Sequence, residues 1–469
     1  MKDMTPTAMS AACNGKLISS DNISQFSTAQ GVVIDSRLVH DGFVFVAICG
    51  ENMDGHQYID QAYANGAMIV ISEKQLNTTK PYILVQSTRQ ALKDLAAFYL
   101  GRLNTKVVGI SGSVGKTSTR EFIASVLAQK YNVHKTAGNF NNELGLPLTI
   151  FQIRDEHQVA VLEMGISDFG EMHRLAAISR PDVAVLTNIG PAHLESLGSR
   201  AGVLKAKTEM FDHLRDNAYV ILNGDDDMLC TIPQVQGKSP IFYGIGTTKP
   251  NNAVYQNKSI YADNIQNLGL NGIQMTLHIA DNSINVHIPT PGEHRVYNAL
   301  AAATVGHQMG LCLDEIRRGL ESVQMIQGRT NLIHAGNITV IDDCYNANPL
   351  SMQAAIDLLS STQGRTIAVL GDMGELGSDS SKMHYDIGRY LAGKDIDVLF
   401  CAGTLAHELA RGARENTPQC DVHEFNTRDE MLQELLPFLH DGDSVLVKAS
   451  HFMQFTNVVT GIITHHTSD

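Results

Sequence analysis

Residues 107–117, which read VVGISGSVGKT, decide the fold expected for this chain. A hydrophobic strand runs into a turn that contains Gly112 and Gly115, and a helix with an apolar stripe follows. Backbone N–H groups at glycines can approach phosphate oxygens, because no Cβ stands in the way. The N-terminus of the helix adds a partial positive charge. This strand–turn–helix unit therefore predicts a loop that binds the phosphates of a nucleotide.

The end of this loop supplies two side chains that such sites use. Lys116 can reach the β- and γ-phosphates of a nucleoside triphosphate, and the hydroxyl of Thr117 can bind Mg²⁺. The strict pattern has a glycine where Ile110 stands here, so a chance Gly-Lys-Thr in a loop is the alternative. The strand before it and the helix after it favour the phosphate loop. The loop contacts expected for ATP are Ser111, Gly112, Ser113, Val114, Gly115, Lys116, Thr117 and Ser118.

Strands and helices alternate after this loop, which is typical of a parallel, doubly wound sheet. A different pattern spans 273–288, where apolar and polar residues alternate on both sides of Asp281-Asn282. That alternation predicts a β-hairpin with one buried face, which we expect to form an antiparallel side sheet or flap. The strands expected in the doubly wound sheet are Val107–Ile110, Val159–Glu163, Val183–Thr187 and Tyr219–Asn223.

The length of 469 residues requires more than one core. We predict an α/β protein of three domains: a small N-terminal α/β domain over 1–105, a central phosphate-loop domain over 106–327, and a Rossmann-like C-terminal α/β domain over 328–469. The central sheet is expected to be mostly parallel, with the antiparallel hairpin at its side. Outside the central domain, the expected strands are Val32–Ile34, Val44–Ile48, Ala67–Ile71, Tyr82–Val85, Thr339–Asp342, Thr366–Leu370, Val398–Cys401 and Ser444–Val447.

Charge and cysteine usage exclude several classes of protein. The formal net charge is −14 and no Lys/Arg run occurs, which argues against a nucleic-acid-binding protein. The cysteines number seven, which is odd, and form no CxxC pair, so neither a disulfide framework nor a structural zinc site is expected. No apolar run reaches the length of a membrane span, and residues 1–15 have no signal-peptide core. We expect a cytoplasmic protein.

Three polar residues follow predicted strands of the central sheet, at the edge where open α/β sheets bind ligands. Glu163 ends its strand, Asn188 follows the next one, and His193 lies in the loop beyond. A carboxylate near a phosphate loop is a natural Mg²⁺ ligand, but Glu163 is also compatible with a helix-capping or surface acid. By residue type alone, His193 is better interpreted as an ordinary loop histidine.

Lys207 stands out because it shares a helical stripe with apolar residues. It is three residues from Leu204 and three from Met210, whereas Lys205 faces away. A lysine on a buried face is costly unless it is paired, modified or able to extend its ammonium group to solvent. Extension to solvent is the usual solution for an isolated lysine, so the residues alone leave its role open.

Several stretches together resemble the Mur ligase family, whose members build the peptide of the bacterial cell-wall precursor, over essentially the whole chain. The most discriminating is Thr187–Glu195, TNIGPAHLE, which differs from the Asp-His-Leu-Asp-x-His-Gly pattern of members that add diaminopimelate or lysine. The other stretches are the phosphate loop, DSR at 35–37, FVAICG at 45–50, DGH at 54–56, TAGNFNNE at 136–143, AKTEMF at 206–211, YNALAA at 297–302, GR at 328–329 and DDCYNANP at 342–349.

The resemblance implies roles for the residues that chemistry leaves open. Glu163, His193 and Lys207 would join Lys116 as the catalytic group. Lys207 would be carbamylated and would help to position a second Mg²⁺, so that Thr117, Glu163, His193 and Lys207 serve the metal ions. The binding roles implied are the uridine nucleotide for Asp35, Ser36, Arg37, Asp54 and Gly55, the peptide substrate for Asn139 and Asn142, and further ATP contacts for Asn298, Arg329, Asp343 and Asn346.

The resemblance also implies the reaction. A monomeric, ADP-forming ligase with ATP and Mg²⁺ would join D-alanyl-D-alanine to the terminal carboxylate of UDP-N-acetylmuramoyl-tripeptide through an acyl phosphate. The alternatives are a ligase that adds diaminopimelate or lysine, a folylpolyglutamate synthase-like ligase, and a phosphate-loop regulator without ligase chemistry. Two positions depart from the family pattern: Arg295 stands where relatives often have asparagine, and His451 ends a Lys-Ala-Ser-His stretch where Lys-Gly-Ser-Arg is commoner.

Overall fold

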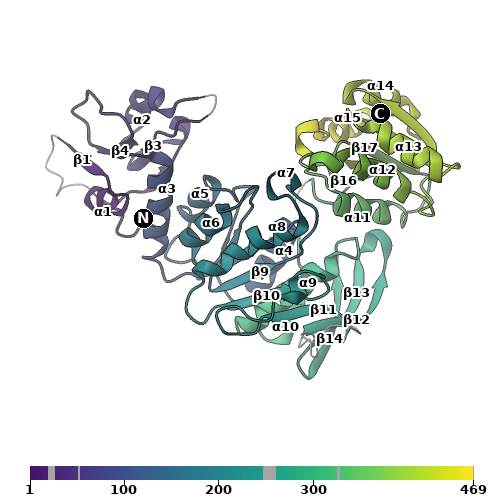
Figure 1. Ribbon diagram of the computed structural model, residues 1–469, viewed down its shortest axis with the longest axis horizontal. Coiled ribbons are helices and arrows are strands. Elements are labelled where there is room, and N and C mark those ends of the chain that lie inside the picture. The colour runs from purple at the N-terminus through teal and green to yellow at the C-terminus, as the bar shows by residue number, and fades with distance from the viewer. Residues whose placement is uncertain (20–26, 51–52, 247–259, 325–327, 468–469) are drawn as a thin grey trace.

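The computed structural model describes residues 1–19, 27–50, 53–246, 260–324 and 328–467. Three β-sheets with their helices form three successive units, and the first and third lie at opposite ends of the long axis, with the second between them (Figure 1). Each sheet lies inside one of the three segments predicted from the sequence. The predicted boundary at 327 lies outside the described residues.

The first unit is a five-stranded sheet in the order β1-β5-β4-β3-β2, with helices packed against it. Its elements are β1 (Lys16–Ile18), β2 (Gly31–Val33), β3 (Phe43–Val46), β4 (Ala67–Ser72), β5 (Tyr82–Leu84), α1 (Pro6–Ala12), α2 (Ile59–Ala64) and α3 (Thr88–Leu100). Strands β2 to β5 are parallel, and β1 pairs antiparallel with β5. Helix α3 also packs against the second unit. There the Tyr99 hydroxyl donates to the Ile153 carbonyl at 2.5 Å.

The second unit is built on one nine-stranded sheet in the order β14-β13-β12-β11-β10-β9-β6-β8-β7. The strands are β6 (Lys106–Ser111), β7 (Val133–Lys135), β8 (Val159–Glu163), β9 (Val183–Leu186), β10 (Tyr219–Asn223), β11 (Ile241–Ile245), β12 (Ile260–Asn267), β13 (Ile273–Ile279) and β14 (Asn282–Ile288). Strand β6 lies between β8 and β9 and is parallel to both. The predicted hairpin is present as β13 and β14. With β12 it extends the edge of this same sheet and is not a separate layer, because β12 pairs in parallel with β11.

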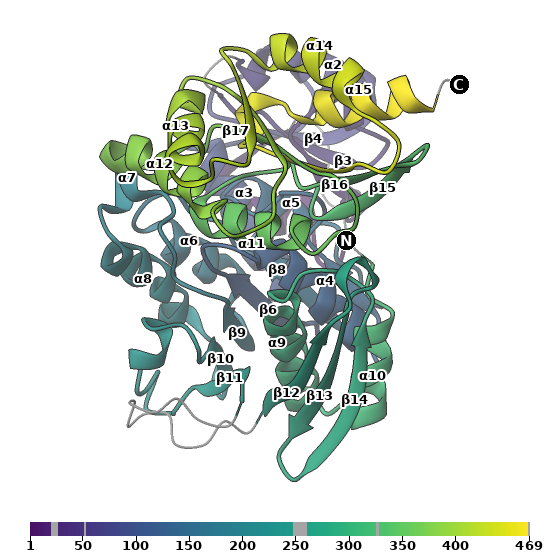
Figure 2. The same ribbon diagram turned by 90° about the vertical axis from the view of Figure 1, so that its right-hand side faces the viewer.

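The helix after β6 and an alanine-rich helix pack together against this sheet (Figure 2). The helices of the unit are α4 (Lys116–Leu127), α5 (Gly145–Ile150), α6 (Glu171–Ser179), α7 (Leu194–Leu197), α8 (Arg200–Thr208), α9 (Arg295–Gln308) and α10 (Leu313–Glu321). The predicted apolar stripe of α4 is confirmed, since Phe122, Ile123, Val126 and Leu127 are all buried in a core shared with α9. This packing brings the first turn of α9 beside the phosphate loop.

The third unit is a six-stranded sheet in the order β15-β16-β20-β17-β18-β19. Its elements are β15 (Asn331–Ala335), β16 (Ile338–Asp342), β17 (Thr366–Gly371), β18 (Val398–Ala402), β19 (Asp421–Phe425), β20 (Ser444–Lys448), α11 (Pro349–Leu359), α12 (Ser380–Tyr390), α13 (Ala406–Asn416), α14 (Arg428–Phe438) and α15 (Thr456–His466). All pairs are parallel except β15 with β16. Within the described ranges, no helix is long and apolar enough to cross a membrane.

Candidate active site

The phosphate loop joins the end of β6 to the start of α4 and uses its glycines for their backbone freedom. Gly115 has a φ of 80° and caps α4, a conformation that other residues rarely adopt. Gly112 has a φ of 153°, and a Cβ built on it would lie 1.9 Å from the hydroxyl oxygen of Thr187. A side chain at Gly112 would therefore displace the segment that follows β9.

That segment holds the loop through polar contacts. The Asn188 side chain accepts from the Val114 N–H and donates to the Val114 carbonyl, both at 3.0 Å. The Thr187 hydroxyl donates to the same carbonyl at 2.7 Å. The Ser113 hydroxyl accepts from the Gly190 N–H at 2.9 Å and donates to the Gly190 carbonyl at 3.1 Å. These contacts fix the shape of the loop. Thr187 and Gly190 lie in the TNIGPAHLE stretch, but neither of them was assigned a role from the sequence.

Lys116 lies in the first turn of α4, ahead of the buried Thr117 and Ser118. Its ammonium group turns over the loop and donates to the Gly112 carbonyl at 2.9 Å. Burial lowers the pKa of Lys116 from its usual value, although the carboxylate of Glu163 acts in the opposite direction. A partly desolvated cation interacts more strongly with an anion than a hydrated lysine does. This position is therefore suited to a polyphosphate.

Glu163 ends β8 and is 1% exposed, which excludes the surface acid that the sequence also allowed. Arg120 Nη1 donates to its carboxylate at 3.2 Å, and Asn141 Nδ2 donates to it at 2.8 Å. Arg120 is fully buried and also donates to Glu121. Neither Arg120 nor Asn141 was predicted as a site residue. The available signal for Arg120 was its place one turn after Lys116 on an amphipathic helix.

Lys207 is 1% exposed, near the end of α8. The helix ends at Thr208 and the chain continues as a 3₁₀ helix, η4 (Glu209–His213), so the apolar stripe does not belong to one continuous α-helix. Among the described residues, no hydrogen bond or ion pair of the Lys207 ammonium group is found. Burial, together with the positive charge of Lys116, lowers the pKa of Lys207 well below its usual value. A buried amine of this kind favours its neutral, nucleophilic form.

His193 connects the second unit to the third. Its Nδ1 lies 2.8 Å from Oε2 of Glu375, in the loop that follows β17. The hydrogen bond to His193 lowers the pKa of Glu375, and the positive charge of Lys116 adds to this effect. The histidine that the sequence treated as ordinary is thus part of a contact between two units. Glu375 was missed, because its loop carries no pattern that points to a partner far away in the chain.

Two residues of α9 face the first turns of α4. Asn298 is 6% exposed, and its Oδ1 accepts from the Thr119 hydroxyl at 3.1 Å. Its Nδ2 is buried and has no partner within the described part of the chain. Arg295 donates to the Ser118 hydroxyl at 2.6 Å. An unpaired, buried amide beside the phosphate loop fits a nucleotide base, whose ring nitrogens accept hydrogen bonds.

Three predicted nucleotide residues, Arg329, Asp343 and Asn346, gather around the ends of β16 and β20. The guanidinium group of Arg329 lies 4.1 Å from the centroid of the Tyr345 ring. Lys448 Nζ donates to the Asp343 carboxylate at 2.5 Å and to the Asn346 carbonyl at 3.1 Å. The buried Lys448 therefore holds this segment in place beside the linker.

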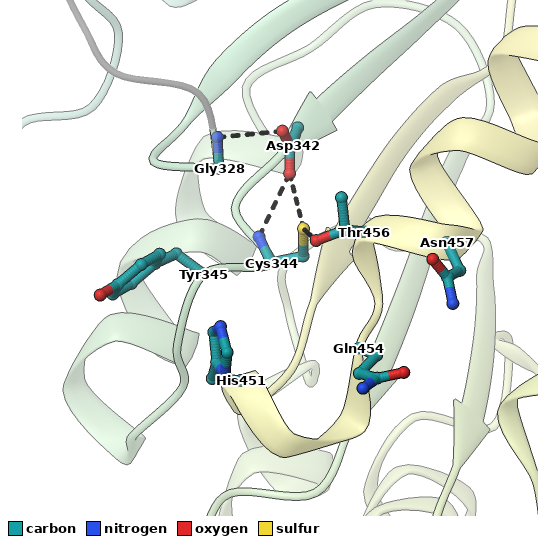
Figure 3. Close-up of a pocket in the computed structure, with 8 residues that line it drawn as sticks. All are labelled: Gly328, Asp342, Cys344, Tyr345, His451, Gln454, Thr456 and Asn457. Carbon is teal, nitrogen blue, oxygen red and sulfur yellow. Dashed lines mark hydrogen bonds between the residues drawn. The ribbon is translucent and has the colours of Figure 1, made fainter. Parts of the chain in front are cut away.

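A pocket of about 450 Å³ opens at the same end of the third sheet (Figure 3). At one wall, the Asp342 carboxylate accepts from the Gly328 N–H at 3.0 Å. Facing it, the ring centroids of Tyr345 and His451 are 5.9 Å apart. The other residues that line the pocket are Cys344, Gln454, Thr456 and Asn457.

The residues expected to bind a uridine nucleotide lie in two turns of the first unit. Residues 35–37 follow β2 and residues 54–56 follow β3, and these strands are parallel neighbours. The two turns therefore share one edge of the sheet. Hydrogen bonds from the Arg37 side chain lower the pKa of Asp35 to about 2. Lys74, which donates to Asp54 at 2.7 Å, lowers the pKa of that carboxylate.

The predicted peptide and metal residues are not gathered into a preformed cage. Asn139 is exposed, and Asn142 accepts from the Gly145 N–H at 2.8 Å as part of the start of α5. Among the described residues, no group of three or more His, Cys, Asp or Glu side chains is placed to hold a metal ion. Mg²⁺ does not require such a group, because it keeps several waters and is commonly held by one or two carboxylates with substrate phosphates.

Three family models match the chain: "Mur ligase family, catalytic domain" over residues 28–100, "Mur ligase middle domain" over 110–306 and "Mur ligase, glutamate ligase domain" over 328–451. UDP-N-acetylmuramoyl-tripeptide--D-alanyl-D-alanine ligase from Bacillus subtilis (strain 168) is 35% identical over 439 residues, covering 92% of this chain and 93% of that protein. A crystal structure of MurF from Acinetobacter baumannii has a TM-score of 0.87 and 32% identity over 98% of both chains. MurF from Thermotoga maritima in complex with ADP has a TM-score of 0.81 and 30% identity over 93% of this chain and 98% of that one.

Proposed function

The chain belongs to the Mur ligase family, and we infer that it joins D-alanyl-D-alanine to the terminal carboxylate of UDP-N-acetylmuramoyl-tripeptide. The reaction converts ATP to ADP and phosphate and forms an amide bond, and its product is the pentapeptide precursor used in peptidoglycan synthesis. The first unit holds the uridine nucleotide, the second holds ATP, and the third holds the incoming dipeptide and closes on the ATP.

The observation that carries this proposal is the meeting of Lys116, Glu163 and Lys207 around one phosphate loop. Beyond the effect of burial, the carboxylates of Glu163 and Glu375 act to raise the pKa of Lys116, and the charge of Lys116 lowers the pKa of Lys207. Glu375 belongs to the third unit, and its Oε2 lies 2.8 Å from Nδ1 of His193 in the second. A phosphate-loop regulator without ligase chemistry has no evident use for a buried lysine that lacks a partner in the described ranges, or for a loop from another unit at this point. A ligase that forms an acyl phosphate can use the lysine to place charge and the loop to exclude water.

The chemistry has two steps. The γ-phosphoryl group of ATP passes to the substrate carboxylate, which gives an acyl phosphate and ADP. The amine of D-alanyl-D-alanine then attacks the acyl carbon, and phosphate leaves from the tetrahedral intermediate. The first step brings two anions together, so Lys116 and the loop N–H groups are needed to neutralise the developing charge. Mg²⁺, held by Thr117 and Glu163 with His193 nearby, would add positive charge at the phosphates.

We propose that Lys207 is carbamylated. The nitrogen of a neutral amine attacks CO₂ and loses one proton to solvent, which gives a carbamate anion, and the depressed pKa of Lys207 favours the amine that this needs. The carbamate is an anion beside the ammonium group of Lys116 and a suitable ligand for a second Mg²⁺. The modification would therefore replace a neutral amine, which has no partner among the described residues, with an anion that can pair with the ammonium group of Lys116.

Closure of the third unit on the second serves to protect the acyl phosphate. Water would hydrolyse this intermediate, and a closed site excludes it. The contact of His193 with Glu375 and the hydrogen bond from Arg295 to the Arg329 carbonyl are points at which the two units already meet. Asn139 and Asn142 are proposed to hold the peptide part of the first substrate.

The protein is proposed to work in the cytoplasm as a monomer on small-molecule substrates. Its seven cysteines all lie among the described residues and none forms a disulfide, which suits a reducing compartment.

Release of ADP is expected to require UDP-N-acetylmuramoyl-tripeptide and D-alanyl-D-alanine together. An assay that couples ADP release to the oxidation of NADH measures this, with each substrate omitted in turn as the control. Equal release with diaminopimelate or glutamate as the acceptor amine would reassign the substrate. Release with neither substrate would leave only a nucleotide hydrolase.

Replacing His451 with alanine is expected to raise the KM for D-alanyl-D-alanine by about tenfold, because one hydrogen bond to a charged group is lost. The KM for ATP should change less than twofold, as expected if the pocket in Figure 3 holds the dipeptide. Steady-state kinetics with one substrate varied at a time gives both values. A rise confined to the KM for ATP would instead assign this pocket to the nucleotide.

A further inference from the structure

Two buried N–H donors without partners stand one turn apart on α9. Arg295 is 2% exposed and Asn298 is 6% exposed. Within the described ranges, Arg295 Nε and Asn298 Nδ2 have no hydrogen-bond partner. Residues three apart share one face of a helix, so both donors face the phosphate-loop side. Unpaired buried donors are rare, which makes each a candidate contact for a ligand.

The contact of Arg295 with Ser118 sets the direction of a hydroxyl group. Arg295 Nη1 donates to Ser118 Oγ at 2.6 Å. A serine hydroxyl has one proton to donate, and it keeps that proton while it accepts from the arginine. Ser118 lies two residues after Lys116 in the first turn of α4. Its O–H therefore remains available for a phosphate oxygen.

The other branch of the same guanidinium group reaches the linker between the second and third units. Arg295 Nη2 donates to the carbonyl of Arg329 at 3.4 Å. Arg295 forms no ion pair within the described part of the chain, and burial lowers its pKa to about 10. A buried cation that lacks a counter-ion favours the binding of an anion nearby.

We infer that Arg295 is a positioning residue that couples nucleotide binding to the linker: it holds Ser118 ready to donate to a phosphate oxygen of ATP, and it holds the Arg329 carbonyl. The inference rests on the proposed function for the identity of the nucleotide. A phosphate group beside Arg295 would draw its guanidinium group toward α4, and the same group holds the start of the third unit. Nucleotide binding and the position of the linker are thereby linked through one side chain.

Replacing Arg295 with methionine tests this, because methionine has a similar length and no hydrogen-bond donors. The KM for ATP should rise about tenfold, since a charged hydrogen bond is lost, while the KM for the uridine-linked tripeptide should stay within twofold. Arg295→Lys should recover part of the ATP effect, because it can donate to Ser118. Arg317→Met on α10, whose guanidinium group forms partly exposed ion pairs, is the matched control and should behave as the wild type.

The rate of cleavage by trypsin at the Arg329–Thr330 bond gives a second measurement. The effect of nucleotide on this rate should not change if Arg295 only stabilises the fold. The carbonyl of that bond is the one that Arg295 holds. Mass spectrometry follows the cleavage. In the wild type, ADP or a non-hydrolysable ATP analogue should slow it. In Arg295→Met, saturating nucleotide should no longer slow it. Arg295→Lys should show no more than partial protection, because a single ammonium group cannot reach both partners.

The outcomes separate the inference from the proposed function. The inference would be overturned if a folded Arg295→Met variant had the same KM for ATP as the wild type and the same protection by nucleotide. This holds whatever the acceptor substrate is. Absence of substrate-dependent ADP release in the wild type would overturn the function, while the protection experiment could still be read. If Arg295→Met fails to fold, Ser118→Ala replaces it: a KM for ATP unchanged in Ser118→Ala would also contradict the inference.

Discussion

Replacing Lys116 with alanine is expected to reduce kcat by about 10²–10³-fold or more while the fold is retained. Lys116 is the only side chain of the phosphate loop, residues 111–117, that carries a positive charge, and its ammonium group lies over the Gly112 carbonyl at 2.9 Å. Its removal takes away charge that must meet the transferred phosphoryl group in the transition state. The measurement is ADP release at saturating substrates, with circular dichroism to check the fold.

The matched control for this change is Lys106→Ala, at the other end of β6. Lys106 is exposed and pairs with Asp182 at 2.9 Å on the surface, so its loss should leave kcat within about twofold, since surface pairs contribute little. Normal turnover by Lys116→Ala would contradict the proposed function. A similar loss of activity in both variants would show a general effect of removing charge from this part of the chain.

The second large effect is expected for Lys207→Ala, with kcat lowered by about 10²-fold or more. Lys207 is buried without a partner among the described residues and has a pKa well below its usual value. Alanine cannot form a carbamate, so the site loses an anion beside Lys116. Acetate or propionate should restore part of the activity, because a short carboxylate can enter the space left by the side chain and supply the missing charge.

Lys205→Ala is the control, since Lys205 lies on the same helix but is exposed beside Phe169. It should keep full activity and should not respond to added carboxylic acids. Nuclear magnetic resonance with isotopically labelled bicarbonate measures the modification directly, and the carbamate signal should be present in Lys205→Ala and absent in Lys207→Ala. An inactive Lys207→Ala that no carboxylate rescues, together with a wild type that shows no carbamate signal, would contradict the proposed modification.

The third sheet shows how much of the fold could be predicted from the sequence. The four strands predicted there are confirmed, each to within one residue at either end. Continuous apolar runs bounded by turns are a local property, so strands buried on both faces can be identified without knowing their neighbours. Six strands in the described parts of the three sheets were not predicted: β1, β7, β11, β12, β15 and β19. Four of them, β1, β7, β15 and β19, are edge strands of three to five residues, which carry too little pattern to stand out.

For the catalytic candidates, the sequence likewise identified the residues but not the partners that surround them. Glu163 and Lys207 were singled out from their positions in a strand and on an apolar stripe, and both are buried. Their surroundings were not predictable from the chain order. Arg120 and Asn141 meet the carboxylate of Glu163 only because α4 and the loop before α5 pack over the end of β8.

The sequence by itself determined the phosphate loop and the alternation of strands and helices around it. Both depend on contiguous residues, and a glycine or an apolar residue has its effect on the backbone wherever the rest of the chain lies. Only the tertiary structure decided which partners these residues have: Glu375 for His193, Ser118 and the Arg329 carbonyl for Arg295, and none for the ammonium group of Lys207 in the described part of the chain. Such contacts join residues tens to hundreds of positions apart, and the packing of whole sheets and helices brings them together.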